Sequence, residues 1–356
     1  MGAILKVSYM VTEGQAIKLL NTLRIISMKL RKCCSIYMND ILILESEYYS
    51  QVSIDSYKDV GNVYFNYDDN IDYSEITILV VRLNYVIDKK FLLKFTKLKV
   101  IVSPTTALTH IDVECCDLMN IKVYSLQNCK ELIESVTSTS ELTIGLIISL
   151  LRYIVKSHNS VITDNLWNRD IFRSRQLSRM KLGIIGIGRI GGHVAKYAKS
   201  FGMSISAYDP YQTDSRFEKL QVAKSSLESI LSDSDIITIH ANLRSDNFNL
   251  ISYDEIKLMK PGVLLINTAR GQLMDEQAVC EGIVSNKIGG IAVDVLESEH
   301  KDIHWSNSPF VNLARNGMNV LITPHIGGCT TDAMHITEDH MSKLIISKIK
   351  SGEIYG

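Results

Sequence analysis

Three glycines at positions 186, 188 and 191 and an aspartate at 209 share one segment of the chain. Residues 181–209 read KLGIIGIGRIGGHVAKYAKSFGMSISAYD. Gly186, Gly188 and Gly191 have the spacing that allows a tight turn, a close backbone approach to a pyrophosphate, and contact between helix and strand. A helix that begins at this turn directs unpaired N–H groups and its positive dipole end toward the phosphates. The pattern predicts a dinucleotide site, and its alternative is a nucleotide-like fold that binds nothing.

The acid at the end of the segment selects the dinucleotide. Asp209 closes the apolar stretch SISAYD, where a carboxylate can accept the hydroxyl groups of a ribose. A 2'-phosphate there would meet a like charge, and no arginine follows at once. We therefore predict NAD(H) and not NADP(H).

Three further ionisable side chains follow later apolar stretches. Arg270 follows VLLINTA, Glu299 lies beyond GGIAVDV, and His325 follows NVLITP. A guanidinium can bind a carboxylate, an imidazole can exchange a proton with an alcohol oxygen, and a neighbouring carboxylate favours the protonated ring. Taken singly, such an arginine or glutamate is more often a solvated loop residue, and such a histidine is more often structural than catalytic. Together, in a chain with a hydride-cofactor site, they predict hydride transfer at a 2-hydroxy or 2-keto acid.

Apolar stretches alternate with helix-like stretches on both sides of the glycine turn. This alternation predicts an α/β fold with parallel sheets, helices on both faces, and chemistry at the carboxyl ends of the strands. The strands are expected at 41–46, 62–66, 76–81, 99–104 and 122–126, and later at 236–240, 263–268, 289–295 and 319–323. Helices are expected at 88–95, 111–119, 225–233, 253–260, 275–287 and 331–350.

The same alternation predicts two domains. A substrate domain is expected over residues 39–140 plus 324–356, with the last helix returning to it, and an NAD-binding domain over 141–323. Residues 1–38 are basic and loosely amphipathic. They are expected to be an extension outside the fold or an upstream start before Met38, and a targeting helix is the alternative.

Composition narrows the class of partner. A net charge of −1 gives no electrostatic case for nucleic acid or an anionic membrane, so a small molecule is expected. Seven cysteines without CxxC spacing favour neither a disulfide framework nor a metal site. The longest apolar runs are too short to span a bilayer. Without a recognisable secretory signal, a location in the reducing cytoplasm is expected.

The motifs INTARGQLMDE, GGIAVDVLESE and TPHIGG follow the glycine turn in this order. With it they resemble the D-isomer-specific 2-hydroxyacid dehydrogenases, over roughly residues 41 to 345. The resemblance implies a flavodoxin-like substrate domain, an inserted Rossmann NAD-binding domain and a homodimer formed mainly through the latter. It makes Arg270 the substrate-binding arginine, Glu299 the orienting glutamate and His325 the acid/base.

The resemblance also carries over to single positions. It implies pyrophosphate contacts from Arg189 and Ile190, nicotinamide-side contacts from Thr268 and Asp294, and an adenosine-side loop at His240. In the first domain it implies a substrate-facing Arg82 and a substrate loop at Thr105, Thr106 and Ala107, with Thr106 also reaching the cofactor. Arg82 has a solvated strand-end charge as its alternative. Residues 137–154 resemble a hinge helix and residues 166–177 a dimer arm, in which Trp167 and Phe172 are either anchors on the partner or core residues.

Four residues depart from the family pattern without removing a catalytic group. Ala107 stands where glycine is usual in the substrate loop, Arg179 replaces a glycine, and Asn242 and His300 replace prolines. Two other functions compete with an NAD-dependent dehydrogenase of D-2-hydroxy acids. One is an NAD(H)-sensing corepressor of the same fold with little turnover. The other is an L-specific dehydrogenase, against which the mid-chain position of the glycine turn counts.

Overall fold

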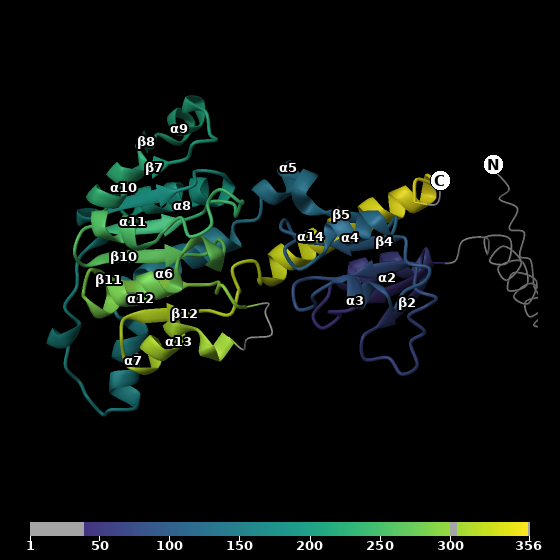
Figure 1. The fold of residues 1–356 in the computed structure, drawn as a ribbon, viewed down its shortest axis with the longest axis horizontal. Coiled ribbons are helices and arrows are strands. Elements are labelled where there is room, and N and C mark those ends of the chain that lie inside the picture. The colour runs from purple at the N-terminus through teal and green to yellow at the C-terminus, as the bar shows by residue number, and fades with distance from the viewer. Residues whose placement is uncertain (1–38, 300–304, 355–356) are drawn as a thin grey trace, which may run out of the picture. The chain divides into compact units, whose positions relative to one another are not determined.

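The computed structural model describes residues 39–299 and 305–354, so the predicted extension 1–38 and His300 lie outside the described residues. The chain forms two compact units (Figure 1). One is Leu126–Thr337, and the other combines residues 39–125 with those from Glu338 onward.

The first unit is built on a five-stranded parallel sheet in the order β2-β1-β3-β4-β5. This is the strand order of flavodoxin-like folds. In register, Ile41 aligns with Val63 on one side and Ile78 on the other. The strands are β1 (Asn39–Ile43), β2 (Gly61–Phe65), β3 (Ile78–Val80), β4 (Val100–Ser103) and β5 (Lys122–Ser125).

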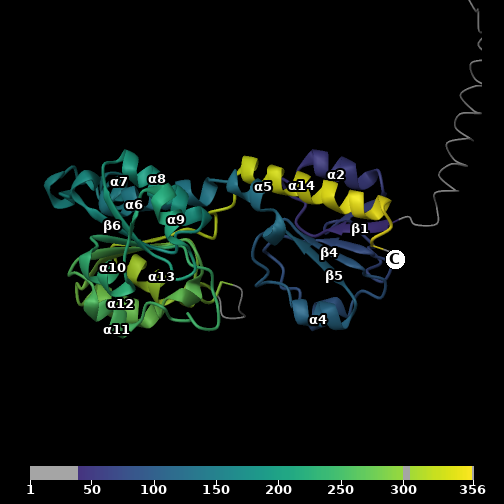
Figure 2. The same ribbon diagram turned by 90° about the horizontal axis from the view of Figure 1, so that it is seen from above.

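Helices cover both faces of this sheet. α2 (Gln51–Lys58) and α14 (Thr331–Lys350) lie on one face and α4 (Val113–Leu118) on the other (Figure 2). α3 (Lys89–Leu92) packs with α4 in a core that includes Leu79 and Ile101. Aspartates start both of these short helices, because Asp88 accepts from the Phe91 N–H and Asp112 from the Cys115 N–H.

The second unit is built on a seven-stranded parallel sheet in the order β12-β11-β10-β9-β6-β7-β8. Successive strands are added on one side of β6 up to β8 and on its other side from β9 onward, while all strands stay parallel. This is the doubly wound arrangement of Rossmann folds. The strands are β6 (Lys181–Ile185), β7 (Ser204–Tyr208), β8 (Ala223–Lys224), β9 (Ile236–Ile239), β10 (Val263–Asn267), β11 (Ile288–Val293) and β12 (Val320–Ile322).

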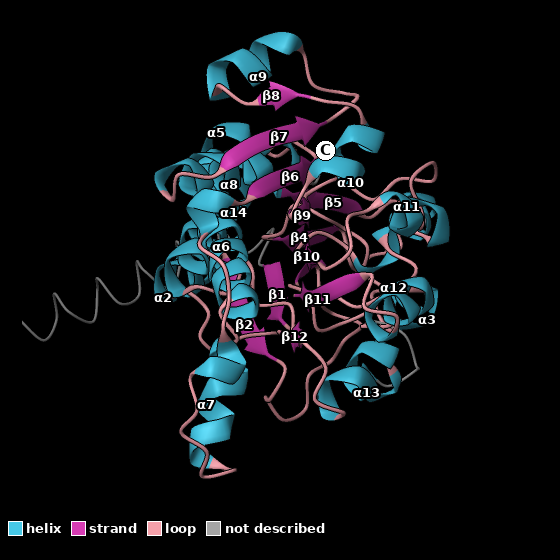
Figure 3. Ribbon diagram, turned by 90° about the vertical axis from the view of Figure 1, so that its left-hand side faces the viewer, coloured by secondary structure: helices cyan, strands magenta, loops and turns pink. Residues whose placement is uncertain are grey.

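Two apolar cores pack against the opposite faces of this sheet. Neighbouring strand residues alternate between them, so that Leu265 belongs to one core and Leu264 to the other. α6 and α8 lie on one side of the strands and α10 to α13 on the other (Figure 3). The helices are α5 (Lys130–Glu134), α6 (Ser138–Leu151), α7 (Ile154–Ile162), α8 (Arg189–Ser200), α9 (Asp214–Leu220), α10 (Leu227–Asp233), α11 (Tyr253–Leu258), α12 (Glu276–Val284) and α13 (Pro309–Arg315).

The compact units change at residues 125/126 and 337/338, whereas the sequence placed the boundaries at 140/141 and 323/324. Hydrogen bonds explain the difference. The carbonyl of Val136 accepts from Arg189, and the N–H of Gly327 donates to Asp294, so both flanking segments are held by the second unit.

No single helix in the described part of the chain is long and apolar enough to cross a membrane. By length and composition alone, the segments Lys130–Leu151 and Ile154–Ile162 reach that requirement only as a pair bent by 57°.

Candidate active site

The glycine turn between β6 and α8 has the geometry that its sequence predicts. Gly186 has φ +94°, and an added Cβ there would lie 2.7 Å from the backbone of Ala241. A Cβ on Gly191 would lie 2.0 Å from the carbonyl oxygen of Gly186. Only glycine fits these two positions, because the clashing atoms are backbone atoms that cannot move aside.

Gly188 differs from its two neighbours in the pattern. A Cβ there would meet no protein atom within 4 Å, so the described residues provide no steric reason for glycine. Gly188 is the N-cap of α8, whose first N–H groups lack partners within the helix. Open space, a bare backbone and a helix N-terminus fit a pyrophosphate that approaches the chain closely.

Asp209 stands directly after β7, and its carboxylate is oriented by two backbone groups. Oδ2 accepts from the N–H of Ile187 at 2.9 Å, and Oδ1 accepts from the N–H of Tyr211 at 2.9 Å. The first bond ties the acid to the glycine turn. The carboxylate is half-buried and keeps lone pairs that can accept ribose hydroxyls.

Two residues predicted to contact the pyrophosphate lie in the first turn of α8. Nη1 of Arg189 donates to the carbonyl of Val136. Burial lowers the pKa of Arg189, and Glu134 opposes this shift. The carbonyl of Ile190 accepts from the Ser140 hydroxyl at 3.2 Å. Both residues therefore also fasten α8 to the segment that leads into α6.

His240, which was predicted beside the adenosine, is half-buried directly after β9, with its Nδ1 enclosed by protein. Its Nε2 lies 2.9 Å from the Thr238 hydroxyl, and its backbone packs against Gly186. Burial lowers the pKa of His240 to about 3. The ring is therefore neutral at physiological pH and shapes the wall behind the glycine turn.

Two residues predicted on the nicotinamide side are buried and already hydrogen-bonded. The Thr268 hydroxyl lies 2.9 Å from that of Thr143 on α6. The Asp294 carboxylate accepts from Thr323 and from the N–H groups of Ile326 and Gly327 at 2.9 and 2.7 Å. Burial raises the pKa of Asp294, and these hydrogen bonds oppose the shift.

Asp294 also positions the predicted acid/base through its backbone, a role that the sequence did not reveal. Its carbonyl accepts from the N–H of His325 at 2.9 Å. Thr323 shares in the same arrangement, since its hydroxyl donates to Asp294. His325 itself has φ +54°, a left-handed conformation that is uncommon for a residue with a Cβ. Such strain is typical of functional sites where surrounding contacts fix the backbone.

Backbone contact joins the loops after β10 and β11. A Cβ on Gly271 would lie 2.1 Å from the backbone of Leu296, so only glycine permits this approach. The Gln272 amide also donates to the carbonyl of Glu297 at 3.2 Å. The residues that precede and follow these contacts, Arg270 and Glu299, are thereby brought to one edge of the sheet.

The structure brings Arg270, Glu299 and His325 together in the second unit. Oε1 of Glu299 lies 3.0 Å from Nδ1 of His325, and the side chains are 17% and 25% exposed. Burial lowers the pKa of Arg270, while the charge of Glu299 opposes the shift. A paired imidazole can exchange a proton, and the half-buried guanidinium near it can bind a carboxylate.

Arg82 in the first unit has protein partners for its guanidinium. Nη1 lies 3.1 Å from Glu338 on α14, and Nη2 donates to the carbonyls of Glu45 and Glu47 at 2.6 and 3.0 Å. These contacts use three of the five N–H donors of the guanidinium, so the predicted substrate-facing role needs a donor beyond those three. The alternative of a solvated charge is also incomplete, because the side chain is only 16% exposed.

The predicted substrate loop follows β4. The Thr105 hydroxyl donates to the carbonyl of Ala107 at 2.9 Å and lies 2.8 Å from the Ser103 hydroxyl. Thr106, between them, is exposed. The loop is thus held by its own side chains and presents Thr106 and a backbone edge outward.

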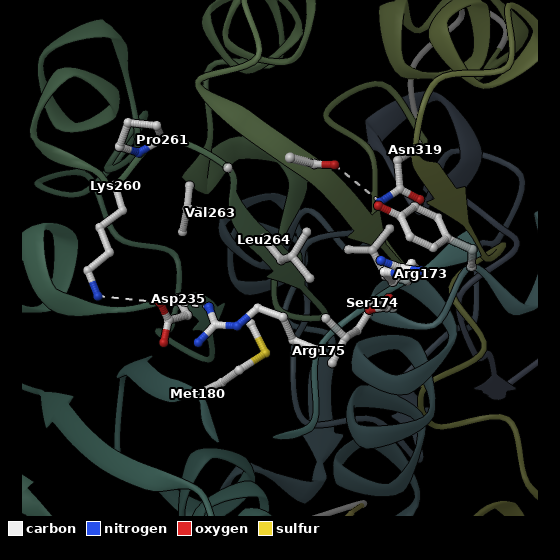
Figure 4. Close-up of a pocket in the computed structure, with 15 residues that line it drawn as sticks. Arg173, Ser174, Arg175, Met180, Asp235, Lys260, Pro261, Val263, Leu264 and Asn319 are labelled. Carbon is white, nitrogen blue, oxygen red and sulfur yellow. Dashed lines mark hydrogen bonds and ion pairs between the residues drawn. The ribbon is translucent and has the colours of Figure 1, made fainter. Parts of the chain in front are cut away.

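A pocket of about 320 Å³ lies at the amino ends of the strands of the second unit (Figure 4). Arg175 and Lys260 both pair with Asp235 there, at 3.3 and 3.4 Å. Asp235 precedes β9, so this pocket is at the edge of the sheet opposite to Arg270 and Glu299. Among residues 39–299 and 305–354, no three His, Cys, Asp or Glu side chains are grouped to hold a metal ion.

Comparison with known proteins identifies the family. Residues 144–327 match the family model for the D-isomer specific 2-hydroxyacid dehydrogenase, NAD binding domain. D-3-phosphoglycerate dehydrogenase from Bacillus subtilis is 32% identical over 255 residues, which are 72% of this chain and 46% of that protein. Hydroxypyruvate reductase from Thermotoga maritima is 33% identical over 262 residues, 73% of this chain and 80% of that protein. The chain thus spans less than half of the first relative and most of the second.

A solved structure agrees with these matches. D-lactate dehydrogenase from Aquifex aeolicus, complexed with NAD and lactic acid, aligns with a TM-score of 0.74 and 26% identity. The alignment covers 88% of this chain and 97% of that one. These findings confirm the predicted α/β fold class with a Rossmann domain, the NAD cofactor and the dehydrogenase class, and they do not support the regulatory alternative. The chain belongs to the D-isomer-specific 2-hydroxyacid dehydrogenase family, and its residues 144–327 match the NAD-binding domain of that family.

Proposed function

We propose that the protein transfers a hydride between nicotinamide C4 of NAD(H) and C2 of a small D-2-hydroxy or 2-keto acid. The observation that carries the proposal is the 3.0 Å pair of Glu299 and His325 in the same compact unit as Arg270 and the glycine turn. The cofactor accepts or supplies the hydride when bound. Gly188 and the first turn of α8 would hold its pyrophosphate, and Asp209 its adenosine ribose.

The chain's own residues perform the remaining chemistry. In the reductive direction, His325 donates a proton to the substrate O2, which becomes the hydroxyl group, and in the oxidative direction it takes the same proton back. Glu299 pairs with Nδ1 and orients the ring, and the proton exchange with the substrate is assigned to Nε2. Arg270 binds the substrate carboxylate and polarises the neighbouring carbonyl oxygen. Its charge persists although burial lowers its pKa, because a guanidinium titrates far above neutrality.

The choice of substrate acid would depend on the substrate loop and on Arg270. Ala107, in place of glycine, adds a methyl group to the loop whose backbone N–H groups are proposed to receive the substrate, together with Thr105 and Thr106. The added methyl group would leave less room beside these N–H groups, which favours small 2-keto acids. The matched relatives are named for phosphoglycerate and hydroxypyruvate, and the aligned structure for lactate, all of which are 2-hydroxy or 2-keto acids.

The proposal predicts the effect of replacing the acid/base. His325→Gln should lower kcat by at least about a thousandfold, because the amide cannot give or take the proton. NADH binding should stay within about twofold, since the glycine turn and Asp209 are unchanged. Stopped-flow turnover and NADH fluorescence titration measure the two quantities. The matched control is His335→Gln, on α14, which should turn over like the wild type. Full activity of His325→Gln would refute the assignment.

The predicted homodimer through the NAD-binding domain has support in the exposed apolar side chains of α7 and the segment after it. Trp167 is 88% exposed, and Ile162 and Ile171 are exposed as well. Phe172 instead packs near Tyr153 of its own chain, with ring centroids 6.4 Å apart. Light scattering of the full chain, compared with Trp167→Asp, tests the dimer, and fractionation of cells that express the chain tests the proposed cytoplasmic location.

A further inference from the structure

Arg216 reaches from α9 to the glycine turn and binds two of its carbonyl oxygens. Nε lies 3.2 Å from the carbonyl of Ile187, and Nη2 lies 2.7 Å from the carbonyl of Gly188. The side chain is half-buried. The carbonyl of Gly188 also accepts from the N–H of Gly192 at 3.0 Å, and Arg216 adds a side-chain donor that contacts both carbonyls.

The orientation of these two carbonyls decides what the turn presents to a ligand. In a trans peptide the C=O and the N–H of one peptide group point in opposite directions. With both carbonyls held toward Arg216, the N–H groups of Gly188 and Arg189 face away from it. Those are the groups at the N-terminus of α8 that a pyrophosphate requires.

Gly192 makes room for this arginine. A Cβ on Gly192 would lie 2.7 Å from Nη2 of Arg216 and 3.3 Å from Leu220. A larger residue at position 192 would push the guanidinium off the turn while leaving its charge in the protein. Positions 192 and 216 are therefore sterically coupled. Gly192, which is not one of the three glycines of the turn pattern, thus has a role of its own.

We propose that Arg216 is a positioning residue for the pyrophosphate of the cofactor, and this inference rests on the NAD site described above. Glycine tolerates more than one backbone conformation, so the peptide groups beside Gly188 can turn over when nothing holds them. A turned peptide would aim a carbonyl oxygen at the phosphates, which repels them. Arg216 opposes this by binding both carbonyls at once through its forked donors, and at Gly188 it adds to the hydrogen bond from the N–H of Gly192.

The test compares three variants with two ligands. Arg216→Met removes the fork but keeps most of the stem, and Gly192→Ala displaces the fork but keeps its charge. Lys219→Met removes an exposed charge from the same helix and serves as the control. ADP-ribose reports the pyrophosphate contacts by calorimetry, and adenosine, followed by ligand-observed NMR, reports the ribose side alone. Arg216→Met should weaken ADP-ribose binding at least about tenfold, Gly192→Ala should weaken it less, and adenosine binding should stay unchanged in all three.

Hydrogen exchange on the ligand-free protein provides a second readout that does not depend on the cofactor. Amides of residues 187–190 should exchange faster in Arg216→Met than in the wild type or Lys219→Met. Unchanged exchange and unchanged ADP-ribose affinity in Arg216→Met would overturn the proposal. Equal loss of adenosine binding, or wild-type affinity in Gly192→Ala, would also overturn it, because the effect would then be general damage or charge alone. If the wild type bound no ADP-ribose, the proposed NAD site would be refuted. Hydrogen exchange of residues 187–190 would still test whether Arg216 holds the turn.

Discussion

At the scale of single residues, the site depends on side chains whose environment fixes one state. Glu299 holds Nδ1 of His325, and Asp209 is oriented by two backbone N–H groups. The backbone of His325 is left-handed, which only a well-supported loop tolerates. His240 is the contrasting histidine, because burial keeps it neutral and leaves its Nδ1 without a hydrogen-bond partner among the described residues.

The buried state of His240 predicts a pH dependence of stability. Its pKa is about 3 in the folded protein and near the ordinary 6.5 in the unfolded chain. Between these values the unfolded chain binds the extra proton, so stability is present above pH 6.5 and falls as the pH drops toward 3. The slope from this one group is at most about 1.4 kcal/mol per pH unit.

Urea unfolding at pH 7.5 and pH 5 measures this effect. His240→Gln should lose less stability between the two pH values than the wild type, because the amide does not titrate. His158→Gln, which replaces an exposed histidine, is the matched control and should keep the wild-type difference. Equal pH differences in all three proteins would show that His240 is not a source of the acid sensitivity.

At the scale of elements, three loops at the carboxyl ends of β10, β11 and β12 create the site. Gly271 lets the first loop touch the second, and Asp294 at the end of β11 holds the third, which carries His325. Each loop is anchored to its neighbour by backbone contacts. The three ionisable side chains are therefore placed by the sheet itself and not by loops that vary independently.

This arrangement predicts the effect of Asp294→Asn. The carboxylate accepts three hydrogen bonds, and an amide NH₂ in its place would face an N–H or hydroxyl donor. Stability should fall by about 1 to 3 kcal/mol, kcat should fall as the His325 loop loosens, and amides of residues 325–327 should exchange faster. Thr323→Val removes one of the three bonds and should show a smaller effect. Unchanged loop exchange in Asp294→Asn would contradict this role.

The sequence predicted the elements that have a clear local pattern, but it did not predict contacts between residues that are distant in sequence. The expected strands and the last helix are present, and the glycine turn has the backbone that its spacing requires. The sequence did not predict β8, α2, α5, α7, α9 or α13, nor the hydrogen bond between Thr323 and Asp294. Such contacts join residues about thirty positions apart, and only the folded sheet brings them together.

At the scale of the whole molecule, each of the two compact units is built on its own parallel sheet, and the two sheets differ in strand order. Helix α14 begins in one unit and ends in the other. In the first unit, Arg82 and Glu338 pair at 3.1 Å and attach α14 to the strand ends. The resemblance of Arg82 to a substrate-facing arginine could not reveal this partner, which lies 256 residues further along the chain. A family pattern assigns a residue by its neighbours in sequence, whereas its contacts depend on the complete fold.

The whole chain is proposed to act as an NAD-dependent dehydrogenase of D-2-hydroxy acids. The most direct measurement is the initial rate of reduction of a panel of small, phosphorylated and branched 2-keto acids, with NADH and NADPH in parallel and the product resolved by chiral chromatography. We expect at least one acid to be reduced to its D-hydroxy product, with kcat/KM at least about tenfold higher for NADH because Asp209 repels a 2'-phosphate. No turnover on any acid, an L-product, or a preference for NADPH would contradict it.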